Sequence, residues 1–151
     1  MSPRIDEQTV ADDRAKLAHA LRELAAVKAR VERDARSVHE QTRSALIQAL
    51  LPVLDNFDRA IATGETQGDA PGIVAGVRMV RRQLESVLQG YGLVRFDAVG
   101  TAFDPSVHEA TNMVAVSDRA RDRFVVDQLE PGYRIGDRLL RAAKVVVGKY
   151  M

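Results

Sequence analysis

The sequence predicts an α+β protein made of a long helical stalk, a short helical hairpin and a small β-module. A seven-residue apolar repeat begins at Val10 and meets no glycine before Gly64, which predicts one long helix. A second stretch with helical spacing stops at Gly92, and beyond it short apolar runs alternate with turn residues, as in β-strands. We therefore expect three parts, with the stalk at residues 1–50, the hairpin at 51–91 and the β-module at 92–151.

A narrow apolar seam indicates that the stalk is one half of a coiled coil. A helix of about 40 residues rises about 60 Å, and a small domain cannot cover a single stripe of that length. A second copy of the chain is the simplest partner, so we expect a homodimer. After Val38 the repeat shifts by four residues, which locally unwinds the supercoil. The residues expected to join the two chains along the stalk are Leu17, Leu21, Leu24, Val31 and Val38.

The seam is loosely packed, because polar residues such as Arg14, Lys28 and Thr42 interrupt it. Helix pairing is stabilised in proportion to the apolar area it buries, so the stalk should unpair at a lower temperature than the hairpin. Opposite charges four residues apart should support the exposed face of the helix by a few tenths of a kcal/mol each. These pairs are Asp12 with Lys16, Glu32 with Arg36 and Asp55 with Arg59.

The hairpin is predicted from two helical stretches separated by turn residues. Pro52 lacks an amide hydrogen, so we expect a kink or a new helix start there. Residues 62–72 have the composition of a loop, with Asp69 and Pro71 able to cap the next helix. Two such hairpins, one from each chain, can form a four-helix bundle. The bundle residues expected at the dimer interface are Leu50, Val53, Phe57, Gly76, Val77, Val80 and Leu84.

Turn residues divide the β-module into short strands. Asp104 and Pro105 can open a single helical turn. Residues 130–133 have proline and glycine in the positions of a type II turn, and residues 135–138 indicate a two-residue hairpin with Arg138 just past its tip. A module this small should depend on packing against the helices. The apolar runs expected as strands are Leu93–Phe96, Met113–Val116, Phe124–Leu129 and Leu139–Val147.

Composition excludes several classes of function. The net charge is +1 and no basic cluster stands out, so nucleic acid is not an expected partner. The chain has no cysteine, and no apolar run approaches the roughly 20 residues of a membrane span. His108 stands beside Glu109 without a second histidine, so we expect it to make a structural hydrogen bond and expect no metal, cofactor or catalysis. The acidic N-terminal residues argue against a transit peptide, and we expect a cytoplasmic protein.

Three motifs in this order resemble the GrpE family, the nucleotide exchange factors of DnaK-type chaperones. The first is Leu-Leu-Pro-Val-Leu-Asp-Asn-Phe-Asp-Arg-Ala at residues 50–60, and the second is Phe103-Asp104-Pro105-x-x-His108-x-Ala110. The third is Gly132-Tyr133-x-x-x-Asp137-x-Leu139-Leu140-Arg141-x-Ala143-x-Val145-x-Val147. The stalk departs from the usual family pattern at residues 24–30, so chaperone contacts made by the stalk are not carried over.

The resemblance implies a bacterial homodimer that presents one β-module to the ATPase domain of a DnaK-type chaperone. The module would open the nucleotide cleft so that ADP leaves. From the loosely packed seam we further expect that heating reduces this activity. Contact residues carried over from the family are Arg138, Phe103, Pro105, Leu129, Val147 and Arg59.

Two other classes of protein fit parts of the sequence. One is a structural coiled-coil scaffold or adaptor whose β-module binds another protein. The other is an enzyme that uses His108 and Glu109, for which turnover should be lost with His108→Ala. Measurement of ADP release from a DnaK-type ATPase domain separates an exchange factor from a scaffold.

Overall fold

The computed structural model describes residues 6–68 and 70–151. The chain divides into two compact units, one reaching to Arg43 and the other running from Ser44 to the C-terminus. The second unit contains both the helical hairpin and the β-module. The division into three parts at residues 50 and 91 stays a prediction. The order of elements confirms the α+β fold class, with two helices followed by small β-sheets.

Helix α1 spans Glu7–Gln67, with an acidic residue in its first turn, where negative charge is favourable. The expected pair of Lys16 and Asp12 is present at 2.7 Å. The other two expected pairs are wrong in detail. Arg36 donates to the backbone carbonyl of Glu32 at 3.3 Å, and Asp55 bonds a residue of the β-module instead of Arg59.

The prediction of a new helix start at Pro52 is wrong, because α1 continues through it. A proline inside a helix costs about 3 kcal/mol. Ile47, Leu51 and Leu54 flank it and are at most 3% exposed. Full burial of each such side chain stabilises by about 1.5–3 kcal/mol, so packing on both sides of the proline outweighs the lost hydrogen bond.

The loop expected at residues 62–72 is also much shorter in the structure. Helix α1 continues to Gln67, and helix α2 (Pro71–Gly90) begins with the proline that the sequence places in its first turn. Gly68 follows α1 with a left-handed φ of +69°, a conformation that ends helices and favours glycine. The proposed cap Asp69 lies outside the described residues.

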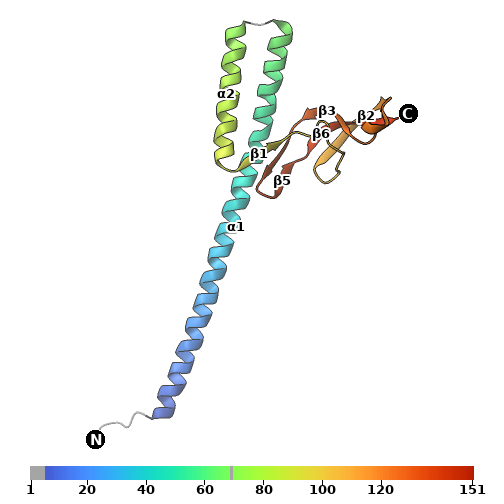
Figure 1. Ribbon diagram of the computed structural model, residues 1–151. Coiled ribbons are helices and arrows are strands. Elements are labelled where there is room, and N and C mark those ends of the chain that lie inside the picture. The colour runs from blue at the N-terminus through green and yellow to red at the C-terminus, as the bar shows by residue number, and fades with distance from the viewer. Residues whose placement is uncertain (1–5, 69) are drawn as a thin grey trace. The chain divides into compact units, whose positions relative to one another are not determined.

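Helix α2 runs back alongside the last turns of α1, which confirms the hairpin (Figure 1). The guanidinium of Arg81 lies between the two helices and bonds Asp58 of α1 at 2.6 Å. Burial alone would lower the pKa of Arg81, but the hydrogen bonds and charges of Asp58 and Glu85 outweigh this and raise it. Because Asp58 lies on α1 and Arg81 on α2, this ion pair favours one register of the hairpin.

The β-module contains two three-stranded sheets. One is antiparallel, in the order β1 (Leu93–Phe96), β4 (Gly132–Ile135) and β5 (Arg138–Arg141). The other has the order β2 (His108–Val116), β6 (Ala143–Tyr150) and β3 (Val125–Glu130), with β2 parallel and β3 antiparallel to β6. The run expected as one strand at residues 139–147 is split, because β5 joins the first sheet and β6 the second. A short 3₁₀ helix, Arg119–Arg121, lies between β2 and β3.

Of the two turns predicted at residues 130–133 and 135–138, the second is confirmed and the first is wrong. Ile135 pairs with Arg138 across the two-residue loop, in which Gly136 has a φ of +54°. Gly132 does not form the expected type II turn, since it begins β4 and is not among the left-handed glycines. Its role is steric, because the ring of Phe96 fills the space that a side chain at Gly132 would need.

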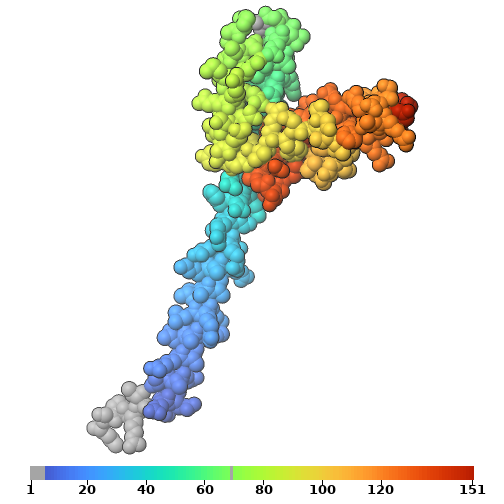
Figure 2. All heavy atoms as spheres, viewed as in Figure 1, coloured from blue at the N-terminus to red at the C-terminus, as the bar shows by residue number. Residues whose placement is uncertain are grey.

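The first sheet packs against the hairpin through one apolar core, and in Figure 2 orange-red atoms of the β-module lie against the blue-green part of α1. This core contains Ile47, Leu51, Leu54, Leu88, Leu93, Tyr133, Ile135 and Leu140. The second sheet has its own small core of Ala98, Val125, Ala143, Val145 and Val147. Neither described helix is long and apolar enough to cross a membrane.

Candidate functional site

Three of the six predicted contact residues line one surface hollow on the second sheet. Phe103, Pro105 and Val147 of β6 are among the residues that line it. Val147 is only 6% exposed, and Phe103 is half-buried against the core of the same sheet. The lining also includes the exposed side chain of Met113, the cations Arg123 and Lys149 and the carboxylate of Asp122.

A hydrogen-bonded turn presents Phe103 and Pro105 at this hollow. The amide of His108 donates to the Asp104 carbonyl at 2.8 Å, which makes the single helical turn that the sequence predicts. The Asp104 carboxylate accepts from the Ser106 amide at 2.9 Å and from the Ser106 hydroxyl at 2.7 Å. These bonds, together with the nearby imidazole, lower the pKa of Asp104.

His108 has the structural role that the sequence predicts. It is 8% exposed, and its Nδ1 accepts a hydrogen bond from the Asp104 amide at 3.0 Å. The imidazole therefore locks the turn from inside. Within residues 6–68 and 70–151, no group of three or more acidic or histidine side chains could hold a metal ion.

The other three predicted contact residues lie on separate elements. Arg138 opens β5 just past the hairpin tip, and its side chain is exposed. Leu129 of β3 is 59% exposed. Arg59 lies on the exposed face of α1 and bonds Asn56 at 3.5 Å. The structure thus groups Phe103, Pro105 and Val147, while a contact role for any of the six stays a prediction.

The predicted dimer residues differ in how far their own chain covers them. Those of the stalk are 57–64% exposed, and in the hairpin Val53 is 39% and Val80 is 52% exposed. Phe57 and Val77 are half-buried, whereas Leu50 and Leu84 pack against the intrachain core. In the part of the chain that the structure describes, a side chain added at Gly76 would meet nothing within 4 Å.

Sequence reasoning missed the line of α1 that packs within the chain. Ile47, Leu51 and Leu54 lie beside the predicted seam and are buried under the first sheet and α2. Their spacing of four and three residues was the available signal, since it marks a second apolar face on the same helix.

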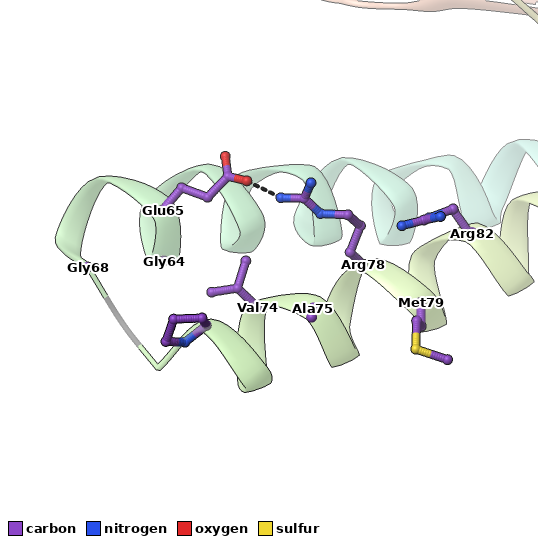
Figure 3. Close-up of a pocket in the computed structure, with 9 residues that line it drawn as sticks. Gly64, Glu65, Gly68, Val74, Ala75, Arg78, Met79 and Arg82 are labelled. Atoms are coloured by element: carbon purple, nitrogen blue, oxygen red, sulfur yellow. Dashed lines mark hydrogen bonds and ion pairs between the residues drawn. The ribbon is translucent and has the colours of Figure 1, made fainter.

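A second hollow lies at the tip of the hairpin, between the two helices (Figure 3). Val74 and Met79 give it an apolar lining, while Arg78 pairs with Glu65 across its edge. Met79 is 68% exposed. The hollow is an open groove between helix faces and differs from a closed ligand cavity.

The structure also contains a polar tie between α1 and the β-module that the sequence did not reveal. Arg141 bonds both carboxylate oxygens of Asp55, with Nη2 at 3.0 Å from Oδ1, and donates to the Pro131 carbonyl at 3.1 Å. Its guanidinium lies 5.2 Å from the centre of the Tyr133 ring. Burial alone would lower the pKa of Arg141, but the hydrogen bonds and charge of Asp55 outweigh it and raise the pKa.

Comparison with known proteins matches residues 5–149 to the GrpE family. The chain is 34% identical to Protein GrpE of Desulfatibacillum aliphaticivorans, over 95% of this chain and 70% of that protein. It is 36% identical to Protein GrpE of Syntrophobacter fumaroxidans, over 95% of this chain and 75% of that protein. Protein GrpE of Brachyspira hyodysenteriae is 32% identical, over 95% of this chain and 72% of that protein.

Proposed function

The chain belongs to the GrpE family of co-chaperone nucleotide exchange factors, and from this premise we propose that it binds the ATPase domain of a DnaK-type chaperone. There it opens the nucleotide cleft and speeds the release of ADP. It acts by binding alone, without a cofactor, in the cytoplasm of a bacterium.

The observation that carries this proposal is the hollow on the second sheet. Phe103, Pro105 and Val147 come from distant points of two motifs and line one surface. An aromatic ring, a proline and a buried valine that line one hollow form the kind of apolar centre on which protein interfaces depend. The hollow is lined by two cations, Arg123 and Lys149, and one carboxylate, Asp122, so the excess positive charge favours an acidic partner surface.

Exchange by this mechanism requires only a difference in affinity. A protein that binds the open cleft more tightly than the closed cleft shifts the chaperone toward the open state, and the size of that shift is the ratio of the two affinities. By linkage, ADP must weaken binding of the exchange factor by the same ratio.

The active form in this proposal is a homodimer. The stalk seam and the hairpin residues Val53 and Val80 leave apolar side chains exposed along helix faces. A second copy covers such faces by pairing the stalks and joining the hairpins as a four-helix bundle.

A structural scaffold is the second candidate, and the same exposed seam favours it, because a coiled coil also serves as a spacer. The test is the release rate of a fluorescent ADP analogue from a bacterial DnaK-type chaperone, measured with increasing amounts of the protein. An exchange factor accelerates release to a plateau. If release keeps its basal rate while the chain forms stable dimers, the scaffold is the better description.

A further inference from the structure

Two polar contacts fix the β-module to one face of α1. Gln48 donates from Nε2 to the Leu140 carbonyl at 3.0 Å, and Asp55 binds the guanidinium of Arg141. Gln48 and Asp55 are seven residues apart, which is two helical turns, so they lie on the same side of the helix. They hold two consecutive residues of β5.

This two-point contact is directional, unlike the apolar core around it. Burial of side chains such as Leu54 and Tyr133 favours contact between sheet and helix but is tolerant of small rotations. A bidentate guanidinium–carboxylate pair has a fixed planar geometry, and the bonds to the Pro131 carbonyl restrict it further. The side chains of Arg141 and Asp55 are 19% and 18% exposed, so water competes weakly for these bonds.

We propose that Gln48 and Asp55 form a mount that sets the orientation of the β-module, and that Arg141 is a positioning residue for nucleotide exchange. This inference rests on the proposed function. Arg141 ends the same strand that Arg138 begins, about 10 Å away at 3.3 Å per residue. β6 starts at Ala143 and carries Val147. The orientation of the chain at Arg141 therefore sets the positions of predicted contact residues on both sheets.

The first experiment measures orientation without the chaperone. Because the chain has no cysteine, spin labels at Ala62→Cys on α1 and Ala115→Cys on β2 are unique, and both sites are exposed. Mixing with excess unlabelled protein restricts the measured distances to one chain. Arg141→Met is expected to broaden the distance distribution, and Arg141→Lys to broaden it less.

The matched control is Arg81→Met. Arg81 is also a buried arginine bonded to an aspartate of α1, but its partners Asp58 and Glu85 both lie in the hairpin. The substitution Arg81→Met therefore removes a comparable ion pair and leaves the mount intact. The distance distribution of this variant should keep its wild-type width.

The second experiment measures ADP release from the chaperone as a function of protein concentration. If only about one molecule in ten holds the competent orientation, the half-saturating concentration rises about tenfold while the plateau rate is kept. We expect this rise for Arg141→Met, a smaller rise for Arg141→Lys and none for Arg81→Met. A merely structural role predicts instead that all three variants change only the melting temperature.

Several outcomes overturn the proposal. Unbroadened distances in Arg141→Met mean that the mount does not orient the module. Broadened distances with an unchanged half-saturating concentration mean that orientation does not limit exchange. If Arg141→Met does not fold, Asp55→Asn keeps the size of the side chain and takes its place in both measurements. If the wild type itself fails to accelerate release, the proposed function fails, whereas the distances still test the mount.

Discussion

The ring of Phe96 occupies the space directly above Gly132, its cross-strand neighbour in the first sheet. Three ring atoms lie closer to the site of a side chain at Gly132 than ordinary contacts allow. The glycine of the third motif is thus needed for the close approach of an aromatic ring, although the sequence suggested a turn.

Gly132→Ala should therefore destabilise the protein by about 1–3 kcal/mol, since an inserted methyl group forces the ring and the strand apart. Urea denaturation followed by circular dichroism measures the change. Gly72→Ala is the matched control, because a side chain there meets nothing within 4 Å among the described residues. Equal stability of Gly132→Ala and wild type would show that the ring moves freely.

The hydroxyl of Tyr133 gives a prediction of the opposite sign. Tyr133 is fully buried in the core under the hairpin, and its hydroxyl has no hydrogen-bond partner among the described residues. Burial also raises its pKa. Tyr133→Phe removes an unsatisfied polar group and should stabilise the folded protein by about 1 kcal/mol. Tyr150→Phe, at a site 47% exposed, should change little, and a loss of stability in Tyr133→Phe would indicate a bonded hydroxyl.

Charge reversal at Arg138 tests the proposed contact with an acidic surface of the chaperone. Arg138→Glu should raise the half-saturating concentration for ADP release at least about tenfold, which corresponds to 1.4 kcal/mol of binding. Helicity and dimerisation should stay as in the wild type, because the side chain is exposed. Arg119→Glu, on the exposed 3₁₀ helix, is the control. An equal effect of both reversals would point to long-range charge and remove Arg138 from the interface.

Asp97 should make stability depend on pH in the acid range. Its carboxylate accepts from Gln128 at 2.8 Å and also pairs with Arg95, and these bonds lower its pKa from 3.8 despite partial burial. Because the folded pKa is the lower one, the stabilisation is complete above 3.8 and is lost as pH falls through the folded value. Urea titrations at pH 5 and below should show that the free energy of unfolding falls less with pH in Asp97→Asn than in wild type. If the free energy of unfolding falls equally with pH in both proteins, the prediction is contradicted.

The order of elements could be predicted because its signals are local. Periodicity identifies both helices, and Gly136 with Asp137 identifies the hairpin from a few neighbouring residues. The prediction of a loop at residues 62–72 was wrong, because composition does not show that Gly64 is buried and lines the same hollow as Val74 of α2. Packing against a second helix overrode the weak helical propensity of this segment.

The candidate site could be predicted only as separate residues. The resemblance named Phe103, Pro105 and Val147, but only the strand order of the second sheet brings them to one hollow. The tie between Asp55 and Arg141 joins residues 86 positions apart. In the sequence, Asp55 has a nearer cation at Arg59, so local spacing gave the wrong partner. Long-range pairing needs the topology of both sheets, which no local pattern contains.

The final prediction concerns temperature and the helix up to Arg43. Its predicted seam includes Lys28 and Thr42, which are exposed in the single chain and bury little apolar area when two stalks pair. Heating should therefore give two transitions, the first a reversible loss of stalk helix that reduces exchange activity. The double variant Lys28→Leu with Thr42→Ile should raise the midpoint temperature of the first transition, because each added seam contact increases the buried apolar area. The midpoint of the second transition should not change. The control variant Arg33→Leu with Glu40→Ile adds similar side chains outside the seam and should not raise the midpoint temperature of the first transition. Circular dichroism melts of the three proteins decide the matter: a single transition, or equal shifts in both double variants, would show that the stalk is not a separate thermal element.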